Sequence, residues 1–392
     1  MKQRTFLILL AVSLAAIGVA WWTARGILPH DRVGTNARLF PDLAATINDV
    51  TQITLTGAGA KTRVTLERGQ TAWGVAERAG YPADWDKVRR LLADFAEATI
   101  VEPKTAIAER YPQLGVEDVA AEDAGGVQAT LDPGPEGAAG PALIIGKANN
   151  AGTGRYVRRP GEAQAYAVSG LFEAPQQIGD WLQKEVLDIA AGRINEVIIR
   201  HADGELVHAR RQPDDPTNFE LVNLPAGREL SSQWAVNALP NSLVKVLIDD
   251  VQPRADDPDF GADVTLLFVT EEGLNIELAL DKQDEMYWLA IDANAEPTAP
   301  PAGSAENSTA AATETAAADG TADTAENSIA AAAESDKTQP DKAPPPPDPV
   351  AEAAALKARH QGWYYQIPEY KYNAWAKHLE DMLKSPAEQT DK

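Results

Sequence analysis

The sequence contains no cysteine in its 392 residues. This absence excludes disulfide bonds, thiolate catalysis, iron–sulfur ligation and the lipidated cysteine of a lipoprotein anchor. It does not exclude an oxidising compartment, because a chain with large hydrophobic cores is stable there without disulfides. Hydrophobic residues make up 44% of the chain, which is enough for such cores. The length suits two or three domains of about 100–150 residues each.

Positive charge is scarce, since 35 Lys and Arg stand against 58 Asp and Glu and give a net charge of -23. A field of this sign repels phosphate backbones, so we expect no nucleic-acid partner. Basic partners and cations remain compatible with it. The simplest interpretation of the acidic surface is solubility.

Motifs that carry chemistry are also missing. The five histidines contain no His-x-x-x-His spacing, and His201 and His208 lie across a predicted hairpin that does not guarantee them a shared face. No Gly-x-Ser-x-Gly segment marks a hydrolase nucleophile. We therefore predict that the chain is not an enzyme, with no catalytic, cofactor-binding or metal-binding residues and no cofactor.

Glycine and carboxylate patterns lead to the same expectation. Gly57-Ala58-Gly59 lacks the third glycine of a dinucleotide loop and is followed by a strand, so we predict a hairpin turn. Ile145-Gly146-Lys147 is followed by alanine where a phosphate loop needs Ser or Thr. The carboxylates of Asp256–Asp263 lack the distal bidentate Glu of a calcium loop, and a solvated acidic turn is predicted.

One long apolar run is present, and it lies at the N-terminus. Lys2 and Arg4 precede an uncharged stretch of about 20 residues, enough at 1.5 Å per residue to cross a ~30 Å hydrocarbon core. Trp21 and Trp22 end it, as indole rings favour the headgroup zone. We predict a single-pass anchor in residues 1–25 of a bacterial inner membrane, with the bulk of the chain periplasmic. A cleaved signal peptide is the alternative, and it exports the chain equally.

After a connector at residues 26–49, residues 50–190 form a first predicted α+β repeat. Alternating apolar and polar residues predict a hairpin at 53–56 and 62–66 and a third strand at 71–77. Asp84 caps a helix whose apolar face holds Trp85, Val88, Leu91, Leu92 and Phe95. Further strands are predicted at 126–131, 141–146, 154–159 and 164–168, followed by a closing helix at 171–187 with Trp181, Leu182 and Val186 on its inner side.

The pattern starts again in a second repeat, residues 191–392. A hairpin at 195–201 and 205–210, a strand at 218–222 and a helix after Ser231-Ser232 follow the order of the first repeat. Residues 293–350 interrupt it with an Ala/Pro/acidic composition that predicts a disordered insertion. Further strands are predicted at 244–251, 263–270, 274–280 and 286–292. In the alignment of the two repeats, residues 362–367 correspond to residues 154–158. A predicted helix with Trp375, Leu379, Met382 and Leu383 corresponds to the predicted helix with Trp181.

The predicted fold is therefore α+β: two tandem repeats of antiparallel β-sheet with packed helices, preceded by one transmembrane helix. The first repeat also holds a set of short motifs: Trp73, Pro82-Ala83-Asp84, Val88-Arg89-Arg90-Leu91-Leu92, Leu114-Gly115, Ile145-Gly146 and Tyr156-Val157. In their order these motifs resemble domain-of-unknown-function family 4340. The second repeat departs from the family pattern, since Phe219 replaces the tryptophan and Pro240 interrupts the helix.

The resemblance implies an envelope protein, because some family members are similar to accessory parts of ABC-type export or gliding-type systems. We therefore expect a non-enzymatic, membrane-anchored accessory or scaffold protein with protein partners in the envelope, ABC transporter subunits among them. The alternative is a periplasmic module that binds glycan or peptide through exposed aromatic side chains. Core packing is the simpler role for most of the seven tryptophans that follow the N-terminal run, which are Trp73, Trp85, Trp181, Trp234, Trp288, Trp363 and Trp375.

Overall fold

The structure, a computed structural model, describes residues 36–133, 140–254, 260–295 and 348–385. This part of the chain folds as two compact units, divided between Lys184 and Glu185. None of the helices in these ranges has the length and apolarity needed to cross a membrane. The transmembrane helix predicted within residues 1–25 lies outside the described residues.

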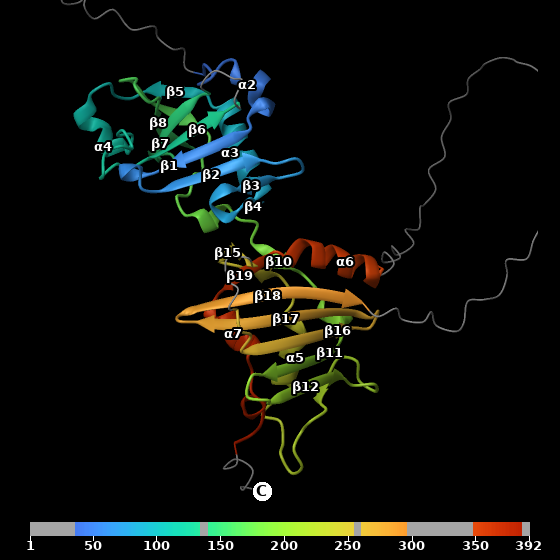
Figure 1. Ribbon diagram of the computed structural model, residues 1–392. Helices are drawn as coiled ribbons and strands as arrows, with labels where there is room; N and C mark the ends of the chain where they lie inside the picture. The colour runs from blue at the N-terminus through green and yellow to red at the C-terminus, as the bar shows by residue number, and fades with distance from the viewer. Residues whose placement is uncertain (1–35, 134–139, 255–259, 296–347, 386–392) are drawn as a thin grey trace, which may run out of the picture. The chain divides into compact units, whose positions relative to one another are not determined.

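The first unit is built on a nine-stranded antiparallel sheet with the order β4-β3-β2-β1-β6-β7-β8-β9-β5 (Figure 1). The predicted strands are confirmed to within a few residues. The helices are α2 (Leu43–Thr46), α3 (Trp85–Glu97) and α4 (Tyr111–Leu114). The strands are β1 (Gln52–Thr56), β2 (Arg63–Arg68), β3 (Trp73–Val75), β4 (Tyr81–Pro82), β5 (Ile100–Pro103), β6 (Val127–Asp132), β7 (Ala142–Ala148), β8 (Gly154–Arg158) and β9 (Ala165–Ser169).

The register of β1 shows why the alternating pattern forms a hairpin. Ile53 pairs with Leu66 and Leu55 with Val64, and all four side chains are buried. Because successive side chains of a strand point to opposite faces, this register places the apolar set on one face of the sheet.

Helix α3 begins where the capping pattern predicts. The side chain of Asp84 accepts a hydrogen bond from the Lys87 amide at 3.2 Å, which satisfies one of the free amides of the first turn. Val88, Leu91 and Phe95 are buried, as the apolar face requires. Trp85 is an exception, because its side chain is 53% exposed. It stands at the first helical position, beyond the end of the buried stripe.

The closing helix predicted for residues 171–187 is wrong. The chain there runs through irregular structure, a short 3-10 turn at Ile178–Trp181 and strand β10 (Glu185–Leu187). Trp181 and Leu182 are buried as expected, but the Trp181 carbonyl accepts from the Asp84 amide at 2.7 Å rather than from its own helix. The apolar spacing identified the buried residues and misidentified the backbone that presents them.

The second unit holds an eight-stranded antiparallel sheet of order β13-β12-β11-β16-β17-β18-β19-β15 and a two-stranded sheet of β10 and β14. Its helices are α5 (Gln233–Asn241), α6 (Pro349–His360) and α7 (Glu369–Trp375). The strands are β11 (Ile194–His201), β12 (Leu206–Arg211), β13 (Phe219–Leu221), β14 (Val246–Leu247), β15 (Asp250–Pro253), β16 (Val264–Thr270), β17 (Leu274–Gln283), β18 (Met286–Ala295) and β19 (Trp363–Ile367).

The two larger sheets share one strand order. The order β3-β2-β1-β6-β7-β8-β9-β5 of the first sheet matches β13-β12-β11-β16-β17-β18-β19-β15 of the second, strand for strand. This correspondence makes β19 the equivalent of β9, so the predicted alignment of residues 362–367 with residues 154–158, in β8, is wrong. Aromatic residues occur in both segments and suggest that alignment. The strands that each one pairs with decide which strands of the two sheets are equivalent.

Helix α6 was not predicted. Asp348 caps it by accepting from the Val350 amide at 3.0 Å, and Pro349 occupies the first turn, where proline is tolerated. The helix packs against β17 and β18. Residues 293–295 belong to β18 and residues 349–350 to α6. The predicted bounds of the insertion, 293–350, therefore include residues of both elements and are wrong at each end. Residues 296–347 between them lie outside the described residues.

The C-terminal helix is also shorter than predicted. Helix α7 ends at Trp375, and Ala376 departs from helical geometry with φ -82° and ψ 42°. A separate 3-10 turn, Glu380–Met382, follows it. The intervening residues 377–379 are therefore free of a helical ladder and approach the turn between β11 and β12.

Candidate functional site

The turn between β11 and β12 places two polar side chains next to each other. His201 ends β11, and its amide donates to the Glu205 carbonyl at 3.0 Å. Asp203 Oδ1 accepts from the Glu205 amide at 2.9 Å, and Gly204 adopts φ 92°, a left-handed conformation that favours glycine. This turn fixes the backbone positions from which His201 and Glu205 extend.

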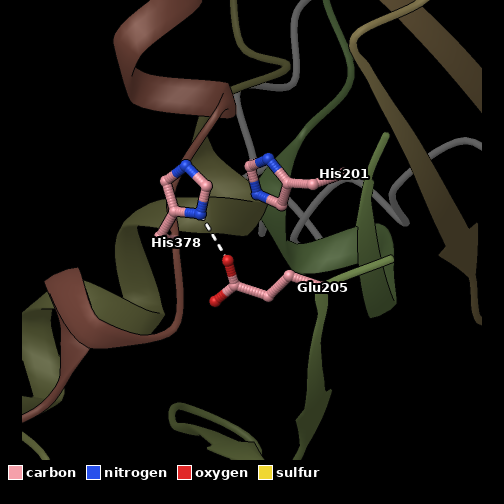
Figure 2. A group of neighbouring side chains, drawn as sticks. All are labelled: His201, Glu205 and His378. Carbon is pink, nitrogen blue, oxygen red and sulfur yellow. Dashed lines mark hydrogen bonds and ion pairs between the residues drawn. The ribbon is translucent and has the colours of Figure 1, made fainter. Parts of the chain in front are cut away.

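A third side chain, His378, reaches the same place from the segment after α7 (Figure 2). The rings of His201 and His378 stack with centroids 4.1 Å apart and planes inclined by 15°. Glu205 Oε2 forms a hydrogen bond and ion pair with His378 Nδ1. We call His201, Glu205 and His378 the His–Glu cluster.

Backbone contacts hold the cluster together. Glu205 Oε1 accepts from the Leu379 amide at 2.7 Å, so both oxygens of this carboxylate bind the segment after α7. His201 Nε2 lies 3.1 Å from the Lys377 carbonyl, the geometry of an N–H donor to that oxygen. The cluster therefore ties the β11–β12 turn to residues 377–379.

The electrostatics of the cluster follow from these contacts. The hydrogen bond to Glu205 raises the pKa of His378, and the negative charges of Asp381 and Asp203 act in the same direction. Burial disfavours the Glu205 carboxylate, but the bonds from His378 and the Leu379 amide outweigh it and lower the pKa of Glu205. The site is thus a carboxylate that faces two imidazoles.

One donor atom from each of the three side chains lies within 4.8 Å of the other two. Two imidazole nitrogens and a carboxylate oxygen are a donor set that divalent transition metals accept. Among the described residues, these are the groups that could hold such an ion.

The sequence did not reveal this cluster. His201 had been considered with His208, but His208 pairs with Glu196 and not with His201. Glu205 and His208 have a Glu-x-x-His spacing, which places both side chains on one face of a helix. Here no helix forms, since Glu205 lies in the turn and His208 in strand β12. His378 is distant in sequence and follows no metal-ligand spacing, so only the fold brings it to His201.

A second feature is a groove of about 440 Å³ beside α3. Exposed Trp85 lines it together with two basic residues, an acidic residue and two apolar residues: Arg38, Arg89, Glu97, Ile47 and Leu92. An aromatic face flanked by cations and apolar groups is a surface on which a sugar ring or a peptide side chain can stack.

Other sequence patterns have structural roles. Gly57-Ala58-Gly59 forms the predicted turn between β1 and β2. Lys147, considered with a phosphate loop, donates to the carbonyls of Pro112 and Gln113 at 2.9 and 3.3 Å. Residues 255–259 of the acidic segment lie outside the described residues.

Residues 73–266 match the family described as Domain of unknown function (DUF4340). This part of the chain belongs to the family. Among curated proteins, no match was found. The matched range begins in β3 of the first unit and ends within β16 of the second, so the DUF4340 match includes parts of both sheets.

The DUF4340 motifs noted in the sequence are explained by packing. Gly115 ends α4 with φ 70°, which favours glycine. A Cβ on Gly146 would lie 2.3 Å from the Leu114 carbonyl oxygen, so the Leu-Gly turn and the Ile-Gly strand require each other. Trp73 and Tyr156 are buried. These motifs build the fold, and they lie apart in sequence from the His–Glu cluster.

Proposed function

We propose that this DUF4340 protein is a non-enzymatic accessory or scaffold protein of the bacterial envelope, anchored in the inner membrane by residues 1–25 with its two units in the periplasm. The observation that carries the proposal is the uncharged apolar run that ends at Trp21 and Trp22, of sufficient length for one span. Such an anchor concentrates the body at the membrane surface, where transport complexes reside.

The duplicated architecture supports a scaffolding role. Two units with the same strand order offer two similar surfaces on one chain, and two weak contacts on a tethered chain reinforce each other. Equivalent helices α3 and α5 each expose a tryptophan in the first turn, Trp85 at 53% and Trp234 at 78%. Tryptophan is enriched at the energetic centres of protein interfaces. We propose that the partners are subunits of an ABC-type transport complex.

The proposal is tested by crosslinking in intact cells, followed by solubilisation of membranes and affinity capture of the full chain. We expect transporter permease or ATPase subunits in the captured material. The matched control replaces residues 1–25 with a cleavable export signal, so that the same body is exported without a tether. Equal recovery from both chains would refute anchoring as the basis of the association, and no transporter subunit from either would refute the partner.

A second candidate function, binding of glycan or peptide, is favoured by the groove at Trp85. Its lining combines one exposed indole with Arg38 and Arg89. Titration of the full chain with envelope glycan fragments and peptides, followed by tryptophan fluorescence, tests it. Saturable binding that is lost in Trp85→Ala and kept in Trp234→Ala supports this function. Absence of saturable binding contradicts it.

A further inference from the structure

The side chains of the His–Glu cluster form hydrogen bonds, and their donor atoms can also bind a metal ion. We propose that His201, Glu205 and His378 bind one divalent transition-metal ion, with Zn²⁺ as the representative chemistry. Two imidazoles and one carboxylate are a donor set that zinc accepts in tetrahedral sites that keep a fourth position for water. Hard cations such as Mg²⁺ prefer oxygen-only sites, which favours zinc and its neighbours.

The distances are compatible with closure onto an ion. Tetrahedral zinc with bonds of about 2.0–2.1 Å holds its ligand atoms about 3.4 Å apart. In the cluster, one donor atom of each side chain already lies within 4.8 Å of the other two. Figure 2 shows the carboxylate of Glu205 beneath the two rings. Closure onto one ion requires the two stacked rings to rotate so that their nitrogens converge, and the separations that this rotation must shorten are small.

The surroundings orient the imidazoles for metal binding. When His201 donates Nε2–H to the Lys377 carbonyl at 3.1 Å, its Nδ1 carries the lone pair that an ion needs. Backbone carbonyls that hold the second ring nitrogen in this way are typical partners of metal-bound histidines. His378 directs Nδ1 toward Glu205, and a metal ion takes the place of the proton shared there.

The local charge favours a cation. Asp203 Oδ1 accepts from the Glu205 amide at 2.9 Å, and Asp381 Oδ2 accepts from the His378 amide at 3.0 Å. These carboxylates are held by backbone groups at the two ends of the cluster. With Glu205 they place three carboxylates near the two imidazoles, and this negative charge lowers the energy of a bound divalent ion.

The equivalent hairpin of the first unit is held by different contacts. There the β1–β2 turn is held by backbone bonds, from the Gly59 amide to the Ala121 carbonyl at 2.8 Å and from the Ala60 amide to the Val119 carbonyl at 3.2 Å. The β11–β12 turn of the second unit is held by the His–Glu cluster instead. The metal ion thus would fasten residues 377–379 to the sheet of the second unit only.

The test uses the full chain in detergent, stripped with EDTA and dialysed, then titrated near pH 7.5 with Co²⁺ and with Zn²⁺. We expect one Co²⁺ per chain with the visible absorption of a four-coordinate site, displaced by Zn²⁺. His201→Asn and His378→Asn should each weaken Zn²⁺ binding more than about tenfold. His208→Asn is the matched control, since His208 lies on the same hairpin but pairs with Glu196.

Binding that is absent from the stripped wild-type chain, or unchanged in His378→Asn, overturns the proposal. Because His378→Asn also removes a bond to Glu205, circular dichroism checks that each variant is folded. X-ray absorption of the zinc-loaded wild-type chain needs no variant. Two imidazole nitrogens in the first coordination sphere support the site, and an all-oxygen sphere overturns it.

Discussion

Arg158 and Asp118 form an ion pair in the first unit, with Nη2 of the buried Arg158 2.6 Å from Oδ1 of the exposed Asp118. The Arg158 side chain is only 3% exposed. Its Nε donates to the Val116 carbonyl at 2.8 Å, its Nη1 donates to the Glu162 carbonyl at 2.9 Å, and its guanidinium lies 4.6 Å from the Tyr111 ring. One guanidinium therefore joins strand β8 to the loop that follows α4.

Arg158→Met tests this role. The substitution leaves two carbonyls without their donors, so we expect the free energy of unfolding to fall by about 3 kcal/mol. Arg158→Lys should have a smaller deficit, because an ammonium keeps the charge but cannot form the planar fork. Urea denaturation of both variants measures the difference. Equal stability of Arg158→Met and the wild-type chain would show that the pair is not important for the fold.

His360 makes the second unit sensitive to pH. Burial lowers the pKa of His360 from 6.5 to about 4, and the charges of Arg359 and Arg254 act in the same direction. Its Nδ1 lies 2.7 Å from the Tyr365 hydroxyl. Between these two pH values the unfolded chain binds a proton that the folded chain does not. The contribution to stability is thus fully present above pH 6.5 and is lost as pH falls toward 4.

We expect this group to reduce the free energy of unfolding by at most about 1.4 kcal/mol per pH unit within that window, and by about 1 kcal/mol between pH 6.5 and pH 5.5. Urea denaturation at pH 6.5 and pH 5.5 measures it before most carboxylates titrate. The control, His360→Gln, keeps a polar side chain without a titrating group and should show a smaller dependence on pH. Identical slopes in both chains would contradict the burial of an uncharged His360.

We expect substitution of Trp85 and substitution of Trp181, both in the first unit, to change the free energy of unfolding by very different amounts. Trp85→Ala should change the free energy of unfolding by less than about 1 kcal/mol, because the ring is half exposed. Trp181→Ala should cost about 3–5 kcal/mol, because Trp181 is fully buried. Denaturation monitored by circular dichroism compares them. A large loss in Trp85→Ala would show that this ring packs into the fold and is not available to a partner.

Removal of residues 296–347 should leave both units folded. Their composition of Ala, Thr, Pro and acidic residues offers little apolar surface for a core. Strands β18 and β19, which lie on either side of this segment and α6 in the sequence, pair directly. A chain with a short Gly/Ser linker in their place should keep its unfolding transition, with a change limited to loop-closure entropy. Deletion of the wider range 293–350 should be harmful, since it removes parts of β18 and α6. Loss of the transition in the shorter deletion would contradict the insertion.

The sequence predicted those elements whose signals are local. Alternation around the turns gave the hairpins β1–β2 and β11–β12, and the cap at Asp84 gave the start of α3. Burial of Trp181 and Leu182 was also foreseen. Their backbone was not, because Leu182 pairs with Ala83 and the Trp181 carbonyl accepts from the Asp84 amide, and such pairing between distant residues leaves no periodic trace in the sequence.

The elements that were missed depend on context. Helix α6 continues the alanine-rich composition of the preceding segment, and only Asp348-Pro349 marks its start. The His–Glu cluster requires α7 to end at Trp375 and residues 377–379 to return to the β11–β12 turn. Neither event is visible from the spacing of histidines, so the candidate site could be recognised from the fold alone.

The most direct test of the account is the position of the chain relative to the membrane. A pair of C-terminal fusions, to alkaline phosphatase and to green fluorescent protein, measures it in living cells, with fractionation as a check. We predict active phosphatase, a dark fluorescent fusion and a chain that remains in membranes after carbonate washing. Fluorescence with inactive phosphatase, or a freely soluble chain that retains residues 1–25, would contradict a periplasmic, membrane-anchored protein.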